Sequence, residues 1–264
     1  MLAAIDVGNT QTVVGLFGPG DGPAGSSPEL IHHWRVSTVE RKTADELALQ
    51  LTQLLALDGL DAKESITGFA VASVVPRLRT ALRDMSERWF GADAVIVEPG
   101  IKTGMPILYD NPREVGADRI ADAVAAYDRH GGPTIVIDFG TATTFEVVSA
   151  KGEYLGGVIL PGIEISLEAL FSHTALLPRV ELVEPKTVLA KNTVESIQSG
   201  VIYGFAAQVD GLVRRLKEEI GPATVVATGG LASLIGPVSQ SVDHHEPWLT
   251  LEGLRIIFAR NQPT

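Results

Sequence analysis

The alternation of apolar and polar residues predicts one series of elements twice along the chain. Residues 2–17 (LAAIDVGNTQTVVGLF) are expected to form two strands around a polar turn, and residues 30–38 a third strand. Residues 43–57 and 77–90 carry apolar side chains at helical spacing, and a short apolar strand follows each of them. The first part of the chain is therefore expected to fold as three strands, then helix, strand, helix, strand.

The second part of the chain repeats this order. We expect a helix at 116–130, a hairpin at 134–149 and a third strand at 152–162. Two helices at 163–173 and 193–220, a strand at 224–230 and a closing helix at 251–261 are expected to follow. Two copies of a three-stranded meander followed by helices and strands predict a duplicated α/β domain with mixed sheets. We expect the two domains to comprise residues 1–115 and 116–264.

Composition excludes several classes of function. The 264 residues are 45% hydrophobic and 20% charged, with a formal net charge of −11, which is typical of a globular protein. There is no cysteine, so a disulfide framework, a zinc–thiolate site and a cysteine nucleophile are excluded. The basic residues are scattered and no apolar run reaches about 18 residues, so we expect a cytoplasmic protein that binds neither nucleic acid nor membrane. The Gly- and Pro-rich stretch at 18–28 is expected to be a surface loop without chemistry.

The two polar turns of the repeat carry similar residues. Three positions match at one constant offset: Asp6 with Asp138, Gly8 with Gly140, and Thr12 with Thr144. Glycine lets the backbone approach a ligand closely, and successive N–H groups next to amide and hydroxyl side chains can hold phosphates. The side chains that could contribute are Asn9, Thr10, Thr12, Thr141, Thr143 and Thr144. Either turn alone would be read as an ordinary hairpin turn rich in Asp, Asn and Thr, but the pair favours phosphate binding.

Two further motifs allow a functional or a purely structural interpretation. Gly229 and Gly230 follow a strand, where they leave room for a base or a ribose, or simply form a tight turn. Asp118 and Arg119 lie in the first turn of the helix at 116–130. The helix dipole favours an ionised carboxylate there, and the guanidinium of arginine suits a carboxylate ligand. An acidic first turn is also common in helices that have no catalytic role.

In combination, these features resemble the actin, sugar kinase and Hsp70 ATPase superfamily, in which two ribonuclease-H-like domains hold ATP in the cleft between them. The resemblance narrows at residues 111–119 (NPREVGADR). Together with DVGNT, SVVP, DFGTATTFEVV, GGVILPGI and TVESIQSGVIYG, this segment resembles the type III pantothenate kinase family, with the motifs in order along essentially the whole chain. The visible departure is the stretch at 18–28, which lies away from every motif.

The resemblance implies an enzyme that phosphorylates pantothenate with ATP to give 4′-phosphopantothenate, the first step of coenzyme A synthesis. It also implies Mg²⁺ with ATP, a K⁺ or NH₄⁺ ion, and a homodimer whose pantothenate pocket lies close to the subunit interface. In this interpretation Asp118 is the catalytic base and Asp138 holds the monovalent cation.

The same resemblance implies the ligand contacts. ATP would be held by Asp6, Val7, Gly8, Asn9, Thr10, Gln11, Thr12, Val13 and Thr141. Pantothenate would be held by Tyr109, Gly116, Ala117, Asp118, Arg119 and Thr193. From the residues alone, Tyr109 could instead be a half-buried loop aromatic, and Thr193 could be the N-cap of its helix. The six histidines are not spaced as metal ligands, and Asp210 is expected to be a solvated charge.

Other functions are possible on such a fold. A non-catalytic regulator that responds to pantothenate or a nucleotide would not need Asp118, Asp138 and both turns, so their presence favours an enzyme. The short chain and the pantothenate-type motifs disfavour an actin-like filament protein. Only the GADR motif and its context separate the expected activity from that of an exopolyphosphatase or an acetate-kinase-like enzyme.

Overall fold

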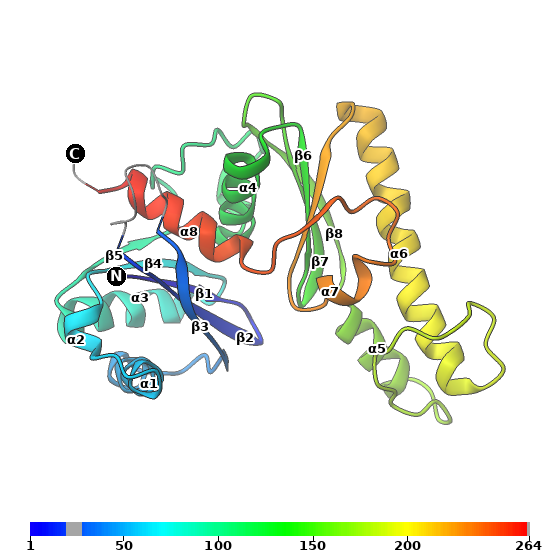
Figure 1. The fold of residues 1–264 in the computed structure, drawn as a ribbon, viewed down its shortest axis with the longest axis horizontal. Coiled ribbons are helices and arrows are strands. Elements are labelled where there is room, and N and C mark those ends of the chain that lie inside the picture. The colour runs from blue at the N-terminus through cyan, green and yellow to red at the C-terminus, as the bar shows by residue number, and fades with distance from the viewer. Residues whose placement is uncertain (20–27, 263–264) are drawn as a thin grey trace. The chain divides into compact units, whose positions relative to one another are not determined.

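The computed structural model describes residues 1–19 and 28–262 (Figure 1). Residues 20–27 of the expected surface loop lie outside the described part of the chain.

The chain divides into two compact units, which we call unit 1 and unit 2. Unit 1 consists of Met1–Pro106, Asp110–Ala125 and the residues from Thr250 onward, and unit 2 consists of Ile107–Tyr109 and Ala126–Leu249. This division differs from a single boundary between residues 115 and 116, because the start of one helix and all but the first residue of the closing helix are grouped with unit 1.

Each unit is built on a five-stranded mixed sheet (Figure 1). The sheet of unit 1 has the order β3-β2-β1-β4-β5, with β1 Leu2–Val7, β2 Gln11–Phe17, β3 Leu30–Ser37, β4 Gly68–Ser73 and β5 Asp93–Ile96. The sheet of unit 2 has the order β8-β7-β6-β9-β10, with β6 Thr134–Phe139, β7 Ala142–Val148, β8 Tyr154–Pro161, β9 Thr224–Thr228 and β10 His244–His245. In both sheets the first three strands pair antiparallel and the last two pair parallel. The predicted duplication of an α/β domain with mixed sheets is therefore confirmed.

The helices follow the predicted order, with a few short additions. The helical segments are α1 Ala44–Leu57, α2 Ala62–Ser65, α3 Pro76–Met85, η1 Ser86–Phe90, η2 Pro112–Glu114, α4 Ala117–His130, α5 Ile163–Ser172, α6 Thr193–Ile220, α7 Ala232–Ile235 and α8 Leu249–Arg260. The short segments α2 and η2 and the two-residue strand β10 were not predicted, because so few residues show no periodicity.

The core of unit 1 lies between its sheet and helices α1 and α3. Ile5 and Val7 of β1 are buried in one apolar cluster with Leu51 of α1 and with Leu78 and Leu82 of α3. The helices bury these side chains because their apolar residues recur at three- and four-residue spacing along one face. This packing fixes β1 as a central strand, and the turn that follows β1 extends from a rigid element.

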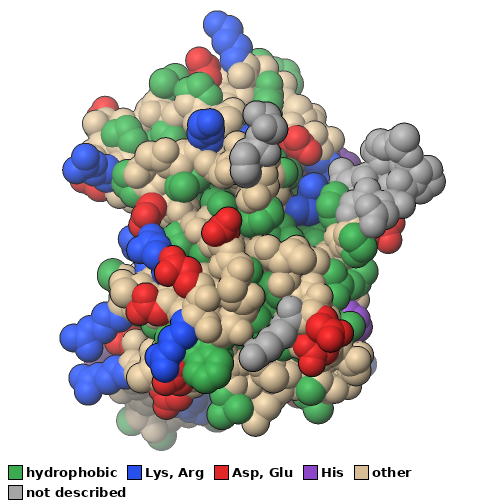
Figure 2. Space-filling model, turned by 90° about the vertical axis from the view of Figure 1, so that its left-hand side faces the viewer, with side chains coloured by type: hydrophobic (Ala, Val, Ile, Leu, Met, Phe, Trp, Pro, Cys, Tyr) green, Lys and Arg blue, Asp and Glu red, His purple; other side chains and the backbone are tan. Residues whose placement is uncertain are grey.

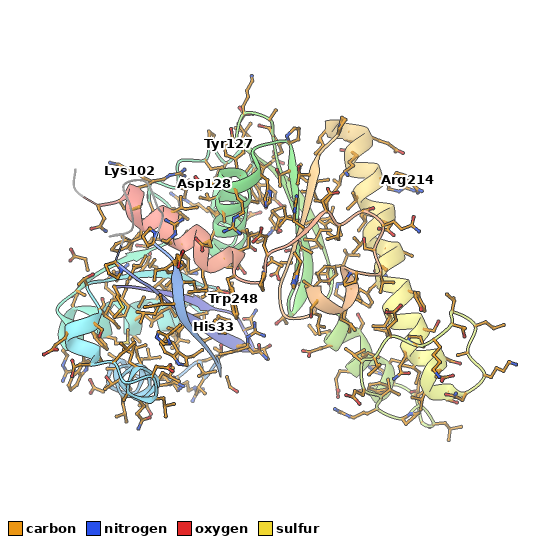
Figure 3. All side chains as sticks on the ribbon, viewed as in Figure 1. His33, Lys102, Tyr127, Asp128, Arg214 and Trp248 are labelled. Carbon is orange, nitrogen blue, oxygen red and sulfur yellow. The ribbon has the colours of Figure 1, made fainter. Side chains whose placement is uncertain are left out.

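The core of unit 2 is built in the same way around β6 and the long helix α6. Ile202, Phe205 and Val209 of α6 are buried in a cluster with Ile137 of β6. Arg214, labelled in Figure 3, lies on the exposed side of α6. A helix with one buried apolar face and one charged face is held by the sheet that it covers.

Helix α8 packs on the sheet of unit 1 although it comes last in the chain. Three glycines leave room for this packing: an added Cβ at Gly15 would collide with Leu251, one at Gly68 with Phe258, and one at Gly253 with the carbonyl oxygen of Ala121. The close approach of Gly253 to Ala121 brings α8 against α4 within this unit. These contacts explain why the closing helix belongs to unit 1.

On the face shown in Figure 2, Lys and Arg side chains lie among Asp and Glu side chains. In the described part of the chain, no helix is long and apolar enough to cross a membrane. The expected absence of a nucleic-acid partner and the expected cytoplasmic location stay predictions.

Candidate active site

The first predicted phosphate turn joins β1 to β2 in unit 1 through the three residues 8–10. The N–H of Gly8 donates to the carbonyl oxygen of Gln11 at 3.0 Å, which closes the turn. Asn9, Thr10 and Gln11 are exposed, whereas Val7, the last residue of β1, is buried. The structure thus presents the polar centre of the predicted ATP segment, residues 6–13, to solvent and anchors its ends in the sheet.

Thr38, which follows β3, is the strongest support of this turn. Its hydroxyl donates to the carbonyl oxygen of Gly8 at 2.8 Å, and its N–H donates to the carbonyl oxygen of Thr10 at 2.9 Å. The hydroxyl oxygens of Thr38 and Thr12 are 2.8 Å apart. Sequence analysis missed Thr38. The available signal was its place at the end of the third meander strand, which pairs with β2 and therefore ends beside the turn.

The loop between β4 and α3 supports the same turn from the other side of β1. The N–H of Val74 donates to the carbonyl oxygen of Val7 at 3.1 Å. The buried hydroxyl of Ser73 is bonded to the backbone of Val75, and the Nε of Arg79 donates to the carbonyl oxygen of Ser73 at 3.1 Å. The SVVP motif is therefore a fixed neighbour of the turn.

The second turn, in unit 2, is one residue shorter. Only Gly140 and Thr141 separate β6 from β7. The expected equivalence of Thr12 with Thr144 is therefore wrong, because Thr143 takes the register position of Thr12 in the second hairpin. Thr143 is also buried, with 1% of its surface exposed, so it does not join the exposed donors that were predicted. Thr141, the predicted ATP contact, is exposed.

Asp138 lies in a row of oxygen-bearing side chains that crosses the sheet of unit 2. It stands opposite Thr144 of β7 and in register with Thr228 of β9. Residues directly opposite one another point to the same face of a sheet, so the carboxylate and the two hydroxyls share a face. Gly229, at φ +93°, follows this row, and an added Cβ there would overlap Oδ1 of Asp138.

Asp6 occupies the same strand position in unit 1 but has different neighbours. It stands opposite Val13 of β2 and in register with Ala72 of β4. The carboxylate of Asp6 is therefore flanked by apolar side chains, whereas that of Asp138 is flanked by hydroxyls. This difference could not be read from the two turn motifs alone.

The predicted substrate motif, Gly116 to Arg119, forms the start of α4 in unit 1. The carbonyl oxygen of Gly116 accepts the N–H of Ile120 at 3.1 Å, so Gly116 stands at the N-terminal end of the helix. Oδ1 of Asp118 accepts the N–H of Arg119 at 2.9 Å and lies against Gly116, where an added Cβ would overlap it. Asp118 and Arg119 are both half-buried, and a carboxylate in this first turn is stabilised by the free N–H groups of the helix.

Tyr109 belongs to unit 2 and packs on β8. Its ring meets that of Tyr154 edge to face, with the centroids 6.4 Å apart, and lies beside Gly156. The neighbouring N–H of Leu108 donates to the carbonyl oxygen of Tyr154 at 2.8 Å. Tyr109 is half-buried, which agrees with the alternative of a half-buried loop aromatic. Part of its ring is still exposed to a ligand.

Thr193 is the first residue of α6, but it is not the N-cap. The cap is Asn192, whose side chain accepts the N–H of Glu195 at 2.9 Å. The alternative role considered for Thr193 is therefore wrong, and its exposed side chain lines a groove of about 820 Å³ within unit 2. The groove runs between α5 and the start of α6 and is lined mainly by apolar side chains, including Leu167, Leu170 and Ile197.

His130, His244 and Asp210 have structural partners. The rings of His130 and His244 stack with centroids 4.5 Å apart, and Nε2 of His130 lies 3.5 Å from Oε1 of Glu246. In the described part of the chain, no three His, Asp or Glu side chains are grouped so that they could hold a metal ion. The interpretation of Asp210 as a solvated charge is wrong, because it accepts bonds from the Ser239 hydroxyl and from the backbone that follows. Partial burial raises the pKa of Asp210, but these hydrogen bonds outweigh it and hold the pKa below its usual value.

Comparison with known proteins identifies the family. A model of the family described as type III pantothenate kinase matches residues 2–215. The chain is 54% identical over 269 residues to the type III pantothenate kinase of Streptomyces griseus subsp. griseus, covering 99% of this chain and 98% of that protein. It is 53% identical over 265 residues to the type III pantothenate kinase of Acidothermus cellulolyticus, covering 100% of both. The chain belongs to the type III pantothenate kinase family.

A solved structure places this family member in a wider fold group. The chain matches the crystal structure of the inorganic polyphosphate/ATP-glucomannokinase of Arthrobacter sp. strain KM with a TM-score of 0.51 and 15% identity, covering 99% of each chain. Similarity at this identity concerns the fold alone. It agrees with the two mixed sheets and with the predicted α/β fold class.

Proposed function

We propose that this type III pantothenate kinase family member phosphorylates pantothenate with ATP to give 4′-phosphopantothenate, the first step of coenzyme A synthesis. The observation that carries the proposal is the 54% identity to a type III pantothenate kinase over 99% of the chain. A non-catalytic regulatory role is not favoured by any feature of the described residues.

The two turns are the proposed ATP phosphate contacts. Residues 6–13 of unit 1 include the end of β1, the turn and the start of β2, and Thr141 of unit 2 lies in the turn after β6, the strand equivalent to β1. Asn9, Thr10, Gln11 and Thr141 are exposed, so a phosphate can approach these residues from solvent. A magnesium ion bound with ATP would neutralise charge on the phosphates.

Asp118 is the proposed general base. Phosphoryl transfer to a primary alcohol requires a group that accepts the hydroxyl proton, and the first turn of α4 stabilises the ionised carboxylate that can do so. The neighbouring Arg119 would bind the carboxylate of pantothenate through its planar guanidinium. Tyr109, Gly116, Ala117 and Thr193 complete the proposed pantothenate contacts.

Asp138 is the proposed ligand of a monovalent cation, K⁺ or NH₄⁺. The row of Asp138, Thr144 and Thr228 offers oxygen donors but a single negative charge. A tightly bound divalent ion favours more carboxylates than this, so the donor set fits a large monovalent ion better. Gly229 keeps the space beside the carboxylate free of a side chain.

A homodimer is the proposed assembly. Several exposed apolar side chains of unit 2 lie on α5, on the segment that follows it and at the start of α6: Ile165, Leu170, Leu176, Val183, Val188, Leu189 and Val194. Burying such a surface against a second copy would remove it from water. Light scattering of the active protein should give about twice the 28.0 kDa mass of one chain, and a fully active monomer would contradict this assembly.

The function is tested with purified protein, MgATP and a panel of acceptors, with ADP release coupled to a dye. Pantothenate should be phosphorylated, whereas acetate, polyphosphate and simple sugars should not. The Asp118→Asn variant serves as the control for contaminating kinases. Transfer to a sugar or to acetate but not to pantothenate would overturn the proposal.

A further inference from the structure

We propose that Thr38 is a positioning residue for the phosphates of ATP, acting through the turn at residues 8–10. This inference rests on the proposed function, because it assumes that the turn binds phosphate. Thr38 bonds to three residues of the predicted ATP segment, Gly8, Thr10 and Thr12, and is not itself one of the predicted contacts.

Counting hydroxyl protons fixes the direction of the side-chain bonds. A threonine hydroxyl has one proton to donate. Thr38 gives its proton to the carbonyl oxygen of Gly8 at 2.8 Å, so in the contact between the two hydroxyls, at 2.8 Å, Thr12 is the donor. The result is a chain from Thr12 to Thr38 to Gly8. The proton of the Thr12 hydroxyl is therefore used within the turn.

This chain of hydrogen bonds affects the electrostatics of the turn through its carbonyl groups. A carbonyl oxygen repels a phosphate oxygen, so a phosphate-binding turn must keep its carbonyls bonded to other donors. The carbonyl oxygens of Val7, Gly8, Thr10 and Gln11 all accept hydrogen bonds from the protein. Thr38 supplies two of these four bonds and thereby controls the orientation of the peptide groups that would face the ligand.

The second hairpin shows that this support belongs to the first turn alone. In unit 1, β3 ends with Ser37 paired to Gln11, and in unit 2, β8 ends with Pro161 paired to Ala142. The next residue is Thr38 in unit 1 and Gly162 in unit 2.

Gly162 has no space for a side chain. An added Cβ there would overlap the carbonyl oxygen of Thr141 and would lie 2.7 Å from that of Gly140. Thr143, the register equivalent of Thr12, is buried, and its hydroxyl has no hydrogen-bond partner within the described residues. The second turn is therefore held by close backbone packing, whereas the first depends on a hydroxyl that can be removed.

The test replaces Thr38 by valine, which keeps the branched shape and removes the hydroxyl. Thr67→Val is the matched control, because the Thr67 hydroxyl donates to the carbonyl oxygen of Met1, which precedes β1 and so lies at the end of that strand away from the turn. Calorimetric titration measures the Kd for MgATP, and steady-state kinetics measure KM for ATP and kcat with pantothenate. Thr38→Val should raise both Kd and KM about tenfold, with kcat within about threefold of wild type, as the loss of an oriented hydrogen-bond network implies. Thr67→Val should leave all three values unchanged.

A serine variant separates positioning from folding. Thr38→Ser keeps the hydroxyl and should bind MgATP within about threefold of wild type, even if the valine variant yields too little folded protein to measure. Wild-type affinity in Thr38→Val, or a tenfold loss in Thr38→Ser, would overturn the role of the Thr38 hydroxyl. If the wild-type protein binds MgATP but does not phosphorylate pantothenate, the proposed function is wrong. The Kd values of wild type and Thr38→Val for MgATP would still decide the role of Thr38. A wild-type protein without affinity for MgATP would overturn both.

Discussion

Gly116 and Asp118 are packed so closely that residue 116 has room for a hydrogen atom but not for a methyl group. An added Cβ would overlap Oδ1 of Asp118, and the same oxygen accepts the N–H of Arg119 at 2.9 Å. The carboxylate proposed as the base is therefore held by the backbone on both sides. Its position should be sensitive to small changes that hardly affect the rest of the fold.

Replacing Gly116 by alanine should lower kcat with little loss of stability. The atom that would be displaced is the end of the Asp118 side chain, which can rotate away, and misplacing a catalytic group by about 1 Å costs up to about 100-fold in rate. We expect kcat to fall about 10- to 100-fold while the melting temperature changes by only a few degrees. Gly211→Ala is the control, because nothing lies within 4 Å of an added Cβ there. Full activity in Gly116→Ala would show that the contact is not needed.

Replacing Asp118 by asparagine should lower kcat by about two to four orders of magnitude, the usual contribution of a general base. The amide has nearly the same shape, so the fold and MgATP binding should survive. Circular dichroism and ATP titration check this, and single-turnover kinetics with pantothenate measure the chemical step. A variant that keeps more than half of wild-type activity would remove Asp118 from the mechanism.

Activity should depend on the monovalent cation through Asp138. In sodium buffer with saturating magnesium the rate should be low, and it should rise strongly on adding potassium or ammonium, because the extra positive charge offsets repulsion among the phosphates. Asp138→Ala should lower activity and abolish this response. Equal wild-type rates in sodium and potassium at matched ionic strength would reassign Asp138 to magnesium or to a structural turn.

Acidification should destabilise unit 2 through His130. Burial, and then the charge of His244, lower the pKa of His130 from its usual value of 6.5. Below about pH 6.5 the unfolded chain takes up a proton at this residue more readily than the folded chain does, so stability is lost as the pH falls towards the folded pKa. Groups that face His130 are His244, Glu246 and Arg129.

The measurement compares melting temperatures at pH 7.5 and 5.5. The melting temperature should fall less on acidification in His130→Asn than in wild type, because the unfolded variant takes up no proton at residue 130. His33→Asn, on the exposed surface of β3 (Figure 3), is the control and should show the wild-type drop. An unchanged drop in His130→Asn would rule out this source of pH dependence.

The parts of the fold that were predicted correctly are those with local signals. Helix α1 was expected from its apolar spacing, and the structure adds a reciprocal cap between Thr43 and Glu46, with the Thr43 N–H donating to the Glu46 carboxylate at 2.8 Å. The duplicated meander was predicted because each strand carries its own alternating pattern. The family resemblance then supplied residue roles that no local pattern contains.

The features that were missed depend on contacts between residues far apart in the chain. Thr38 reaches Gly8 across 30 positions, and Asp210 reaches Ser239 across 29. Strand β10 has two residues and forms because β9 offers it a parallel edge. The mismatch of Thr12 with Thr144 arose because a constant sequence offset cannot reveal a turn shortened by one residue.

The packing of α8 on unit 1 also has a consequence for biosynthesis. Because residues from Thr250 onward complete that unit, its sheet cannot be fully covered until they have left the ribosome. Residues 126–249 of unit 2, by contrast, form one nearly continuous stretch that emerges earlier. Domains commonly fold in order of synthesis, but here the amino-terminal unit should be the last to mature. During translation its nascent strands are consequently exposed to chaperones for longer than those of the unit synthesised after it.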